Sequence, residues 1–251
     1  MKYIQPIFAI ALLAQGSIGS ASDDPIQQAL ESPNRLEVDL ARDPNRHPDE
    51  VLAFFGIKPG MHVLDLFSGG GYYTTIVSDI VGDEGSVTAH NNQAYLVFAN
   101  DELEQRAGKG EASNITRLNS EAGDLKLDEG KYDAALAILT WHDFYYVDPD
   151  IGWGKIDSGF MVETLCHALK PGAVLGIVDH VAEPGGDVWE TAQTLHRIDP
   201  ERIKSDLKGS CFEFEAEADF LRNPNDDYSI NMYNEKVRGK TDRVVYRYRR
   251  K

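Results

Sequence analysis

Basic residues are scarce in this sequence. Its 251 residues include 25 lysines and arginines against 41 aspartates and glutamates, which gives a formal net charge of −16. A surface of this charge repels phosphate backbones, so we expect no nucleic-acid partner. Basic residues cluster only at the C-terminal end, where a solvated strand edge explains them more simply than a binding arm: Arg243, Arg247, Arg249, Arg250 and Lys251.

Cysteine is also scarce. The chain has only Cys166 and Cys211, and their separation does not decide whether they are bonded. We therefore treat both as buried apolar side chains.

Long apolar runs are missing as well. The N-terminal run from Ile4 to Ala14 is too short to span a bilayer and is followed by small residues up to Ala21. This pattern predicts a signal peptide over residues 1–21, cleaved near Ala21. We therefore expect a periplasmic or secreted protein with no stable membrane insertion after cleavage.

Apolar content of 42% and charged content of 26% are ordinary for a globular chain. We expect a helical or irregular lead-in over residues 22–47 and one domain over residues 48–251, as a monomer or a homodimer.

The most informative stretch runs from Met61 to Thr75. A short apolar run containing Asp65 is followed by three glycines and a segment of helical character at residues 72–81. A strand, a glycine loop and a helix in this order form a phosphate- or nucleoside-binding turn. A dinucleotide fingerprint would need a further glycine at position 74, where this chain has Thr74.

The pattern Asp65-x-Phe67-x-Gly69-x-Gly71 resembles the first motif of the class I S-adenosylmethionine-dependent methyltransferases. The resemblance implies that S-adenosylmethionine is the cofactor, with Asp65, Gly69 and Gly71 at its methionine end. It also implies that Asn91, after the second strand, meets the ribose, and that Asp124 meets the adenine amino group. The cofactor-binding residues that we predict are Asp65, Phe67, Gly69, Gly71, Tyr73, Asn91 and Asp124.

Further apolar runs alternate with helical patterns along the chain. Two alternating segments near the C-terminus would pair antiparallel at one edge. The fold class that we predict is α/β, a doubly wound, mostly parallel seven-stranded sheet of Rossmann-like methyltransferase type with an antiparallel last strand. The predicted strands cover residues 63–66, 86–90, 115–118, 132–140, 173–178, 212–216 and 243–248.

Histidine and aspartate pairs follow two apolar strands, as His142-Asp143 and Asp179-His180. The carboxyl ends of parallel strands meet at one edge, so the fold would bring these pairs together. A histidine with a near-neutral pKa can act as a base, so we expect His142 or His180 to be the base and Asp143 or Asp179 to orient it. Three further residues would shape the substrate pocket, with the arginine suited to a carboxylate or phosphate: His196, Arg197 and Asp199.

Together with the Pro-Asp-Glu-Val-Leu-Ala-Phe-Phe segment that begins at Pro48, these pairs resemble a group of exported bacterial proteins predicted to be methyltransferases, over nearly the whole mature chain. The resemblance implies methyl transfer to a small-molecule acceptor. Two alternatives stay open: an exported, non-catalytic protein that binds the nucleoside or cofactor, and a metal-dependent hydrolase built on the His/Asp cluster. No short, fixed ligand spacing marks a metal site, so we assign no metal ligand.

Overall fold

The computed structural model describes residues 24–251 of the chain. The predicted signal peptide over residues 1–21 lies outside the described residues. Within residues 24–251, no helix combines the length and the apolar character that crossing a membrane requires.

A single seven-stranded sheet forms the centre of the molecule, with the strand order β3-β2-β1-β4-β5-β7-β6. Strands β1 to β5 run parallel, and β7 pairs antiparallel with both β5 and β6. The predicted doubly wound sheet and its antiparallel last strand are therefore confirmed. The strands are β1 (His62–Asp65), β2 (Ser86–Asn91), β3 (Ile115–Asn119), β4 (Tyr132–Ile138), β5 (Leu169–His180), β6 (Phe212–Ala218) and β7 (Arg243–Arg250).

The central strands are apolar without alternation because helices cover both faces of a parallel sheet. In β4 the residues from Ala134 to Ala137 are all fully buried. The strand ends at Ile138, earlier than predicted, because Leu139 adopts a left-handed backbone with φ 62°. Strand β5 begins at Leu169, earlier than predicted, and its pairing with β4 shifts register between Tyr132 and Ala134.

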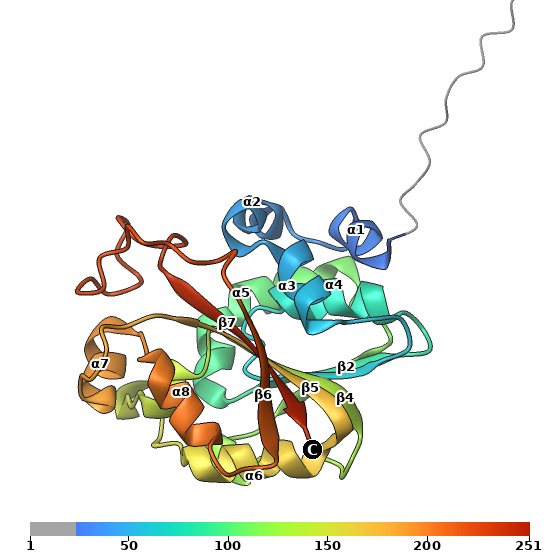
Figure 1. Cartoon of the computed structure of the whole chain (residues 1–251). Coiled ribbons are helices and arrows are strands. Elements are labelled where there is room, and N and C mark those ends of the chain that lie inside the picture. The colour runs from blue at the N-terminus through green and yellow to red at the C-terminus, as the bar shows by residue number, and fades with distance from the viewer. Residues whose placement is uncertain (1–23) are drawn as a thin grey trace, which may run out of the picture.

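Helices cover both faces of the sheet (Figure 1). Side chains of α1, α3 and α4 fill the core on one face, and side chains of α6, α7 and α8 fill the core on the other. The helices are α1 (Pro25–Leu30), α2 (Glu37–Arg46), α3 (Pro48–Phe55), α4 (Tyr72–Val81), α5 (Gln93–Lys109), α6 (Ser158–Ala168), α7 (Val188–Leu195) and α8 (Pro200–Leu207).

The lead-in helices are fastened to the sheet domain by ion pairs. Asp39 of α2 is fully buried and pairs with Arg106 of α5 at 2.8 Å. Arg42, also in α2, pairs with Glu102 of α5 at 2.5 Å. Helix α2 therefore has a fixed position beside the glycine loop, where it borders the candidate site.

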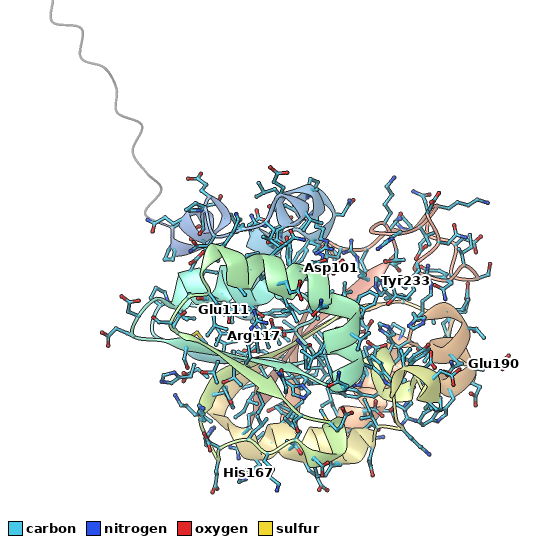
Figure 2. All side chains as sticks on the ribbon, turned by 180° about the vertical axis from the view of Figure 1, so that it is seen from behind. Asp101, Glu111, Arg117, His167, Glu190 and Tyr233 are labelled. Carbon is cyan, nitrogen blue, oxygen red and sulfur yellow. A yellow bond between two sulfur atoms is a disulfide. The ribbon has the colours of Figure 1, made fainter. Side chains whose placement is uncertain are left out.

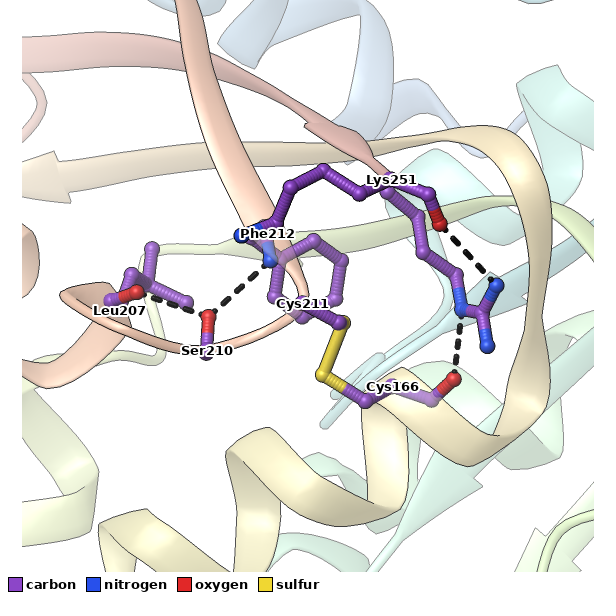
Figure 3. Close-up of a disulfide and its surroundings, with 7 residues drawn as sticks. Cys166, Leu207, Ser210, Cys211, Phe212 and Lys251 are labelled. Carbon is purple, nitrogen blue, oxygen red and sulfur yellow. Dashed lines mark hydrogen bonds between the residues drawn. A yellow bond between two sulfur atoms is a disulfide. The ribbon is translucent and has the colours of Figure 1, made fainter.

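Cys166 and Cys211 form a disulfide (Figure 3). This corrects our treatment of them as buried apolar side chains, since both are only partly buried. The end of α6 and the turn before β6 bring their Cα atoms to 5.9 Å, within the range that a disulfide bridges. The bond joins a helix on one face of the sheet to the edge strand.

Candidate active site

A cleft of about 520 Å³ opens at the carboxyl ends of β1 and β4. In an open parallel sheet this edge is where ligands bind. The cleft is bordered by the glycine loop, by α2 and α5, by the segment after β4, and by the loop between β6 and β7. Its lining includes Arg46, Asp65, Phe67, Gly69, Tyr73, Tyr95, Leu139, His142, Asp143, His180, Tyr233 and Arg243.

The glycine loop needs its glycines for conformation and for space. Gly69 and Gly71 have φ angles of +56° and +81°, which side chains rarely adopt. A Cβ on Gly70 would lie 2.8 Å from the Cβ of Glu102, too close for any other residue. Arg106 donates a hydrogen bond to the carbonyl of Gly70, so its ion pair with α2 also holds this loop.

Phe67 has a left-handed backbone with φ 51°, although it is not glycine. Its ring stacks on Tyr95 at a centroid distance of 5.2 Å and lies 4.8 Å from the ring of His90. Leu139, which also lines the cleft, has φ 62°. Strained residues of this kind concentrate where packing fixes a functional surface.

Asp65 is 3% exposed and accepts a hydrogen bond from the Thr74 hydroxyl at 2.6 Å. Burial raises the pKa of its carboxyl to about 6, although the Thr74 hydroxyl and the charge of Arg46 act to lower it. Thr74 stands where a dinucleotide-binding fingerprint would have its third glycine. Its hydroxyl thus fixes the Asp65 carboxylate at the floor of the cleft. An anionic group here favours a cationic ligand.

Asn91 and Asp124 do not line this cleft. The Asn91 side chain accepts a hydrogen bond from the Gly69 N–H at 2.9 Å, and it donates to the Ser68 hydroxyl and to the Gly69 carbonyl, each at 3.1 Å. It therefore fastens the glycine loop instead of presenting its amide donors to a ribose. Asp124 is exposed on a short turn, contrary to our expectation of a pocket residue.

His142 is fully enclosed between two carboxylates. Its backbone N–H donates to Asp179 at 2.8 Å, its Nδ1 lies 2.7 Å from Asp179 Oδ1, and its Nε2 lies 3.3 Å from Asp143 Oδ1. Burial acts to lower the pKa of His142, but the charges of Asp143 and Asp179 outweigh it and raise the pKa to about 9. His142 is therefore a cation at neutral pH, and it has no nitrogen free to accept a substrate proton.

His180 differs from His142 in its contacts. Its Nδ1 lies 2.6 Å from the Thr241 hydroxyl, whereas its buried Nε2 has no hydrogen-bond partner among the described residues. Burial, and the positive charge of nearby His142, lower its pKa well below the usual value. His180 is thus a neutral imidazole on the cleft wall with one unengaged nitrogen.

The predicted pocket residues His196, Arg197 and Asp199 do not lie together: His196 is near the cleft, whereas the other two have structural roles. His196 packs between the rings of Tyr146 and Tyr233, at 4.4 and 5.0 Å. Arg197 is fully buried and makes four hydrogen bonds, two of them to Asp226, so it anchors the loop before β7 instead of binding a substrate anion. The carboxylate of Asp199 caps α8, so we also withdraw its expected role in the substrate pocket.

Four arginines line the cleft, and the sequence patterns predicted none of them there: Arg42, Arg46, Arg238 and Arg243. Arg243, which we interpreted as part of a solvated edge, is 7% exposed and pairs in register with His180 across β5 and β7. Because β7 runs antiparallel to β5, its first residue, Arg243, lies beside the last residue of β5 at the edge of the cleft. The predicted antiparallel strand could therefore have placed Arg243 in the site. Arg46 of α2 lies over the Tyr72 ring at 4.4 Å, beside Tyr73, whose pKa burial raises to about 12.

The tip of the loop between β6 and β7 covers part of the cleft. Tyr233 approaches α5, where its ring lies 6.4 Å from Phe98 (Figure 2). Gly239 of the same loop and Asn45 of α2 both line the cleft. The cleft thus has a rigid floor at the sheet and a roof made of loop residues.

Comparisons with known proteins agree with this geometry. The family described as protein-L-isoaspartate(D-aspartate) O-methyltransferase matches residues 44–124, which carry the glycine loop. The ubiquinone/menaquinone biosynthesis C-methyltransferase UbiE of Shewanella woodyi is 30% identical over 145 residues, which are 56% of this chain and 51% of that protein. The chain thus spans about half the length of the curated relatives that it matches.

Solved structures extend the likeness to the fold. A S-adenosylmethionine-dependent methyltransferase from Aquifex aeolicus covers 92% of this chain and 100% of its own, with a TM-score of 0.56 and 21% identity. The chain is thus similar to S-adenosylmethionine-dependent methyltransferases, in sequence over about half of its length and in fold over most of its length. S-adenosylmethionine, the cofactor that the sequence motif predicts, is also the cofactor that these similarities imply.

Fold alone does not fix the reaction of a family member. The [4+2]-cyclase SpnF has the same fold, with a TM-score of 0.55 and 19% identity, and it covers 82% of this chain. The function of this chain therefore has to be argued from the side chains of its cleft.

Proposed function

We propose that the chain binds S-adenosylmethionine in this cleft and transfers its methyl group to a small-molecule acceptor. The observation that carries the proposal is the buried Asp65 carboxylate beneath a glycine loop, at the end of β1, in a fold shared with S-adenosylmethionine-dependent methyltransferases. The cleft volume of about 520 Å³ falls within the usual range for small-molecule sites.

The charges of the cleft suit the methionine end of the cofactor, which carries an ammonium, a carboxylate and a sulfonium. Asp65 would face the ammonium. Arg46 and Arg243 would face the carboxylate, which an arginine can bind through two parallel hydrogen bonds. The negative carboxylates around His142 would favour the cationic sulfonium over the neutral product.

The reaction that we propose is a direct displacement. A lone pair of the acceptor attacks the methyl carbon, and the carbon–sulfur bond breaks with its electron pair going to sulfur. The acceptor's proton moves to His180 Nε2, the unengaged nitrogen on the cleft wall. Alignment of acceptor and methyl group supplies most of the rate, and a base adds to it.

Of the two histidines left open by the sequence, we therefore favour His180 over His142. Both nitrogens of His142 face carboxylates, whereas His180 Nε2 has no hydrogen-bond partner among the described residues and Thr241 fixes the opposite side of its ring. Asp179 accepts the backbone N–H of His180 at 2.7 Å, so it positions the strand end and not the imidazole.

The names of the relatives differ in the acceptor atom, one naming an O-methyltransferase and the other a C-methyltransferase. We propose for this chain only methyl transfer, which both names share.

We also propose that the chain is exported, supported by its N-terminal apolar run and by a disulfide of the kind that persists in oxidising compartments. A net charge of −16 supports a small molecule over nucleic acid as the partner.

A second candidate is a cofactor-binding protein without turnover. The use of Asn91 to fasten the glycine loop favours it, because a cleft that holds the ribose less firmly would align the methyl group less well.

Formation of S-adenosylhomocysteine separates the two candidates. The purified chain would be incubated with S-adenosylmethionine and a panel of phenols, amines, thiols and carboxylic acids. S-adenosylhomocysteine that forms only when an acceptor is present would support methyl transfer. Its formation should be lost in His180→Ala and kept in the control His167→Ala, at an exposed position. Binding without product for every acceptor class would favour the second candidate.

A further inference from the structure

Three side chains with metal-binding atoms converge beside the cleft, and none of them moves a proton in the proposed methyl transfer. They are His142 and Asp143, which follow β4, and His196, which caps the end of α7. We infer that these residues form a binding site for a divalent transition-metal ion. The inference does not depend on methyl transfer, because it concerns the ligands alone.

The distances suit a metal of this size. Asp143 Oδ1 lies 3.3 Å from His142 Nε2 and 3.9 Å from His196 Nδ1, and the ligand atoms of the three residues all lie within 4.8 Å of one another. Ligands bound tetrahedrally to zinc, at about 2.0–2.2 Å, are separated by roughly 3.3 Å. A small inward movement of His196 would complete the site.

Neighbouring groups already hold each ligand in the orientation that a metal needs. Asp179 binds His142 Nδ1 at 2.7 Å and leaves Nε2 directed at the cluster, where a bound ion would displace the Nε2 proton into solvent. Tyr95 donates to Asp143 Oδ2 at 2.6 Å and leaves Oδ1. A carboxylate behind a ligating histidine is the usual outer partner in metal sites.

An unsatisfied nitrogen is the independent sign of a missing ligand. Nδ1 of His196 is buried and has no hydrogen-bond partner in the described part of the chain. A buried polar atom without a partner costs free energy, so its retention calls for an explanation. A metal ion bound next to Asp143 Oδ1 would satisfy it.

The ligand set specifies the class of ion. Two imidazoles and one carboxylate favour zinc, iron or cobalt over magnesium and calcium, which prefer oxygen ligands. Three protein ligands also leave coordination positions open, as in catalytic rather than structural sites. His142 and Asp143 line the cleft, so an open position would face a bound molecule.

The test uses the purified, untagged chain after treatment with a chelator. It would be titrated with Co²⁺, followed by visible absorption, and with Zn²⁺ in competition, and bound metal would be counted by elemental analysis. We expect one ion per chain with a dissociation constant in the micromolar range or below. No uptake at millimolar Co²⁺ would overturn the site and leave an ion-paired histidine–carboxylate triad.

The chain contains a matched control for the variant. His196 and His47 both end helices in the left-handed region, with φ and ψ of 48° and 54° and of 44° and 55°. Asparagine tolerates this backbone conformation. We expect His196→Asn to weaken Co²⁺ binding at least tenfold and His47→Asn to leave it unchanged.

The orienting role of Asp179 gives a second readout. Asp179→Asn should weaken Co²⁺ binding by about 10- to 100-fold, the usual effect of losing an outer partner. Equal Co²⁺ affinity in the native chain, His196→Asn and Asp179→Asn would contradict the site. Titration of the metal-free chain with S-adenosylmethionine, run in parallel, separates failure of the metal site from failure of the proposed function.

Discussion

The two walls of the cleft are built on different principles. The cofactor wall, from Asp65 to Tyr73, consists of contiguous residues whose conformation the backbone dictates. The histidine wall gathers His142, Asp143, Asp179, His180 and His196 from three separate segments. On the first wall one buried carboxylate stands nearly alone, whereas on the second the carboxylates act on the charge of His142, and His142 acts on His180.

This difference explains why two buried histidines have opposite properties. The rings of His142 and His180 lie 5.8 Å apart. Two carboxylates raise the pKa of His142 to about 9, and the resulting cation helps to lower the pKa of His180. A strand-end histidine therefore has no role that its sequence position alone can assign.

The largest expected effects come from the buried ion pairs that support each wall. Asp39→Asn on the cofactor side and Asp226→Asn on the other should each lower the free energy of unfolding by about 3–5 kcal/mol, because a buried guanidinium loses its counter-charge. Urea unfolding measures both. Asp128→Asn at an exposed pair is the control, with at most about 1 kcal/mol lost. Losses no larger than the control would show that the walls do not depend on these pairs.

The disulfide should stabilise the fold without affecting either wall. It closes a loop of 45 residues, so replacing Cys166 and Cys211 by serine should cost about 4 kcal/mol of unfolding free energy. Affinity for S-adenosylmethionine should stay the same, because the bond joins α6 to the start of β6, away from the cleft. A reductant should destabilise the native chain by a similar amount and leave the double variant unchanged.

Substitution of the base tests the histidine wall. His180→Ala should lower the turnover number at least 100-fold without changing the affinity for S-adenosylmethionine, because proton removal is lost and cofactor contacts remain. Added imidazole should restore part of the rate. Full turnover in His180→Ala would show that His180 is not the base.

The smallest effect concerns the charge of Asp65. Its pKa of about 6 lies above the ordinary 3.8, so the folded chain binds more protons than the unfolded chain between these values. Stability should therefore fall as pH rises from about 4 to 6 and then level off. Affinity for the cationic cofactor should rise roughly tenfold from pH 5 to 7, as the carboxylate ionises.

Both trends should disappear in Asp65→Asn, which keeps the side-chain shape and has no ionisable group. Thermal unfolding and calorimetric titration over this pH range measure them. A pH dependence that persists in Asp65→Asn would assign the titration to another group.

The sheet and the cofactor wall could be predicted from sequence because their signals are local. Continuous apolar runs mark the buried strands, and three glycines after Asp65 mark the turn. The strand-end histidines were also predicted to converge, since sheet topology alone brings them to one edge.

Other roles depend on packing that no local pattern encodes. Asn91 has the position of a ribose ligand, but its amide is engaged by the glycine loop. Arg197 looks like a substrate-binding arginine, but its partner Asp226 is in a distant loop. Arg243 was misread because its burial follows from pairing with β5.

The most direct test of the central claim is calorimetric titration of the chain with S-adenosylmethionine, beside Asp65→Ala and the exposed-position control Asp124→Ala. We predict a micromolar dissociation constant that Asp65→Ala weakens at least tenfold and Asp124→Ala leaves unchanged. No binding at millimolar cofactor, or equal affinity in Asp65→Ala, would contradict the assignment of this cleft to S-adenosylmethionine.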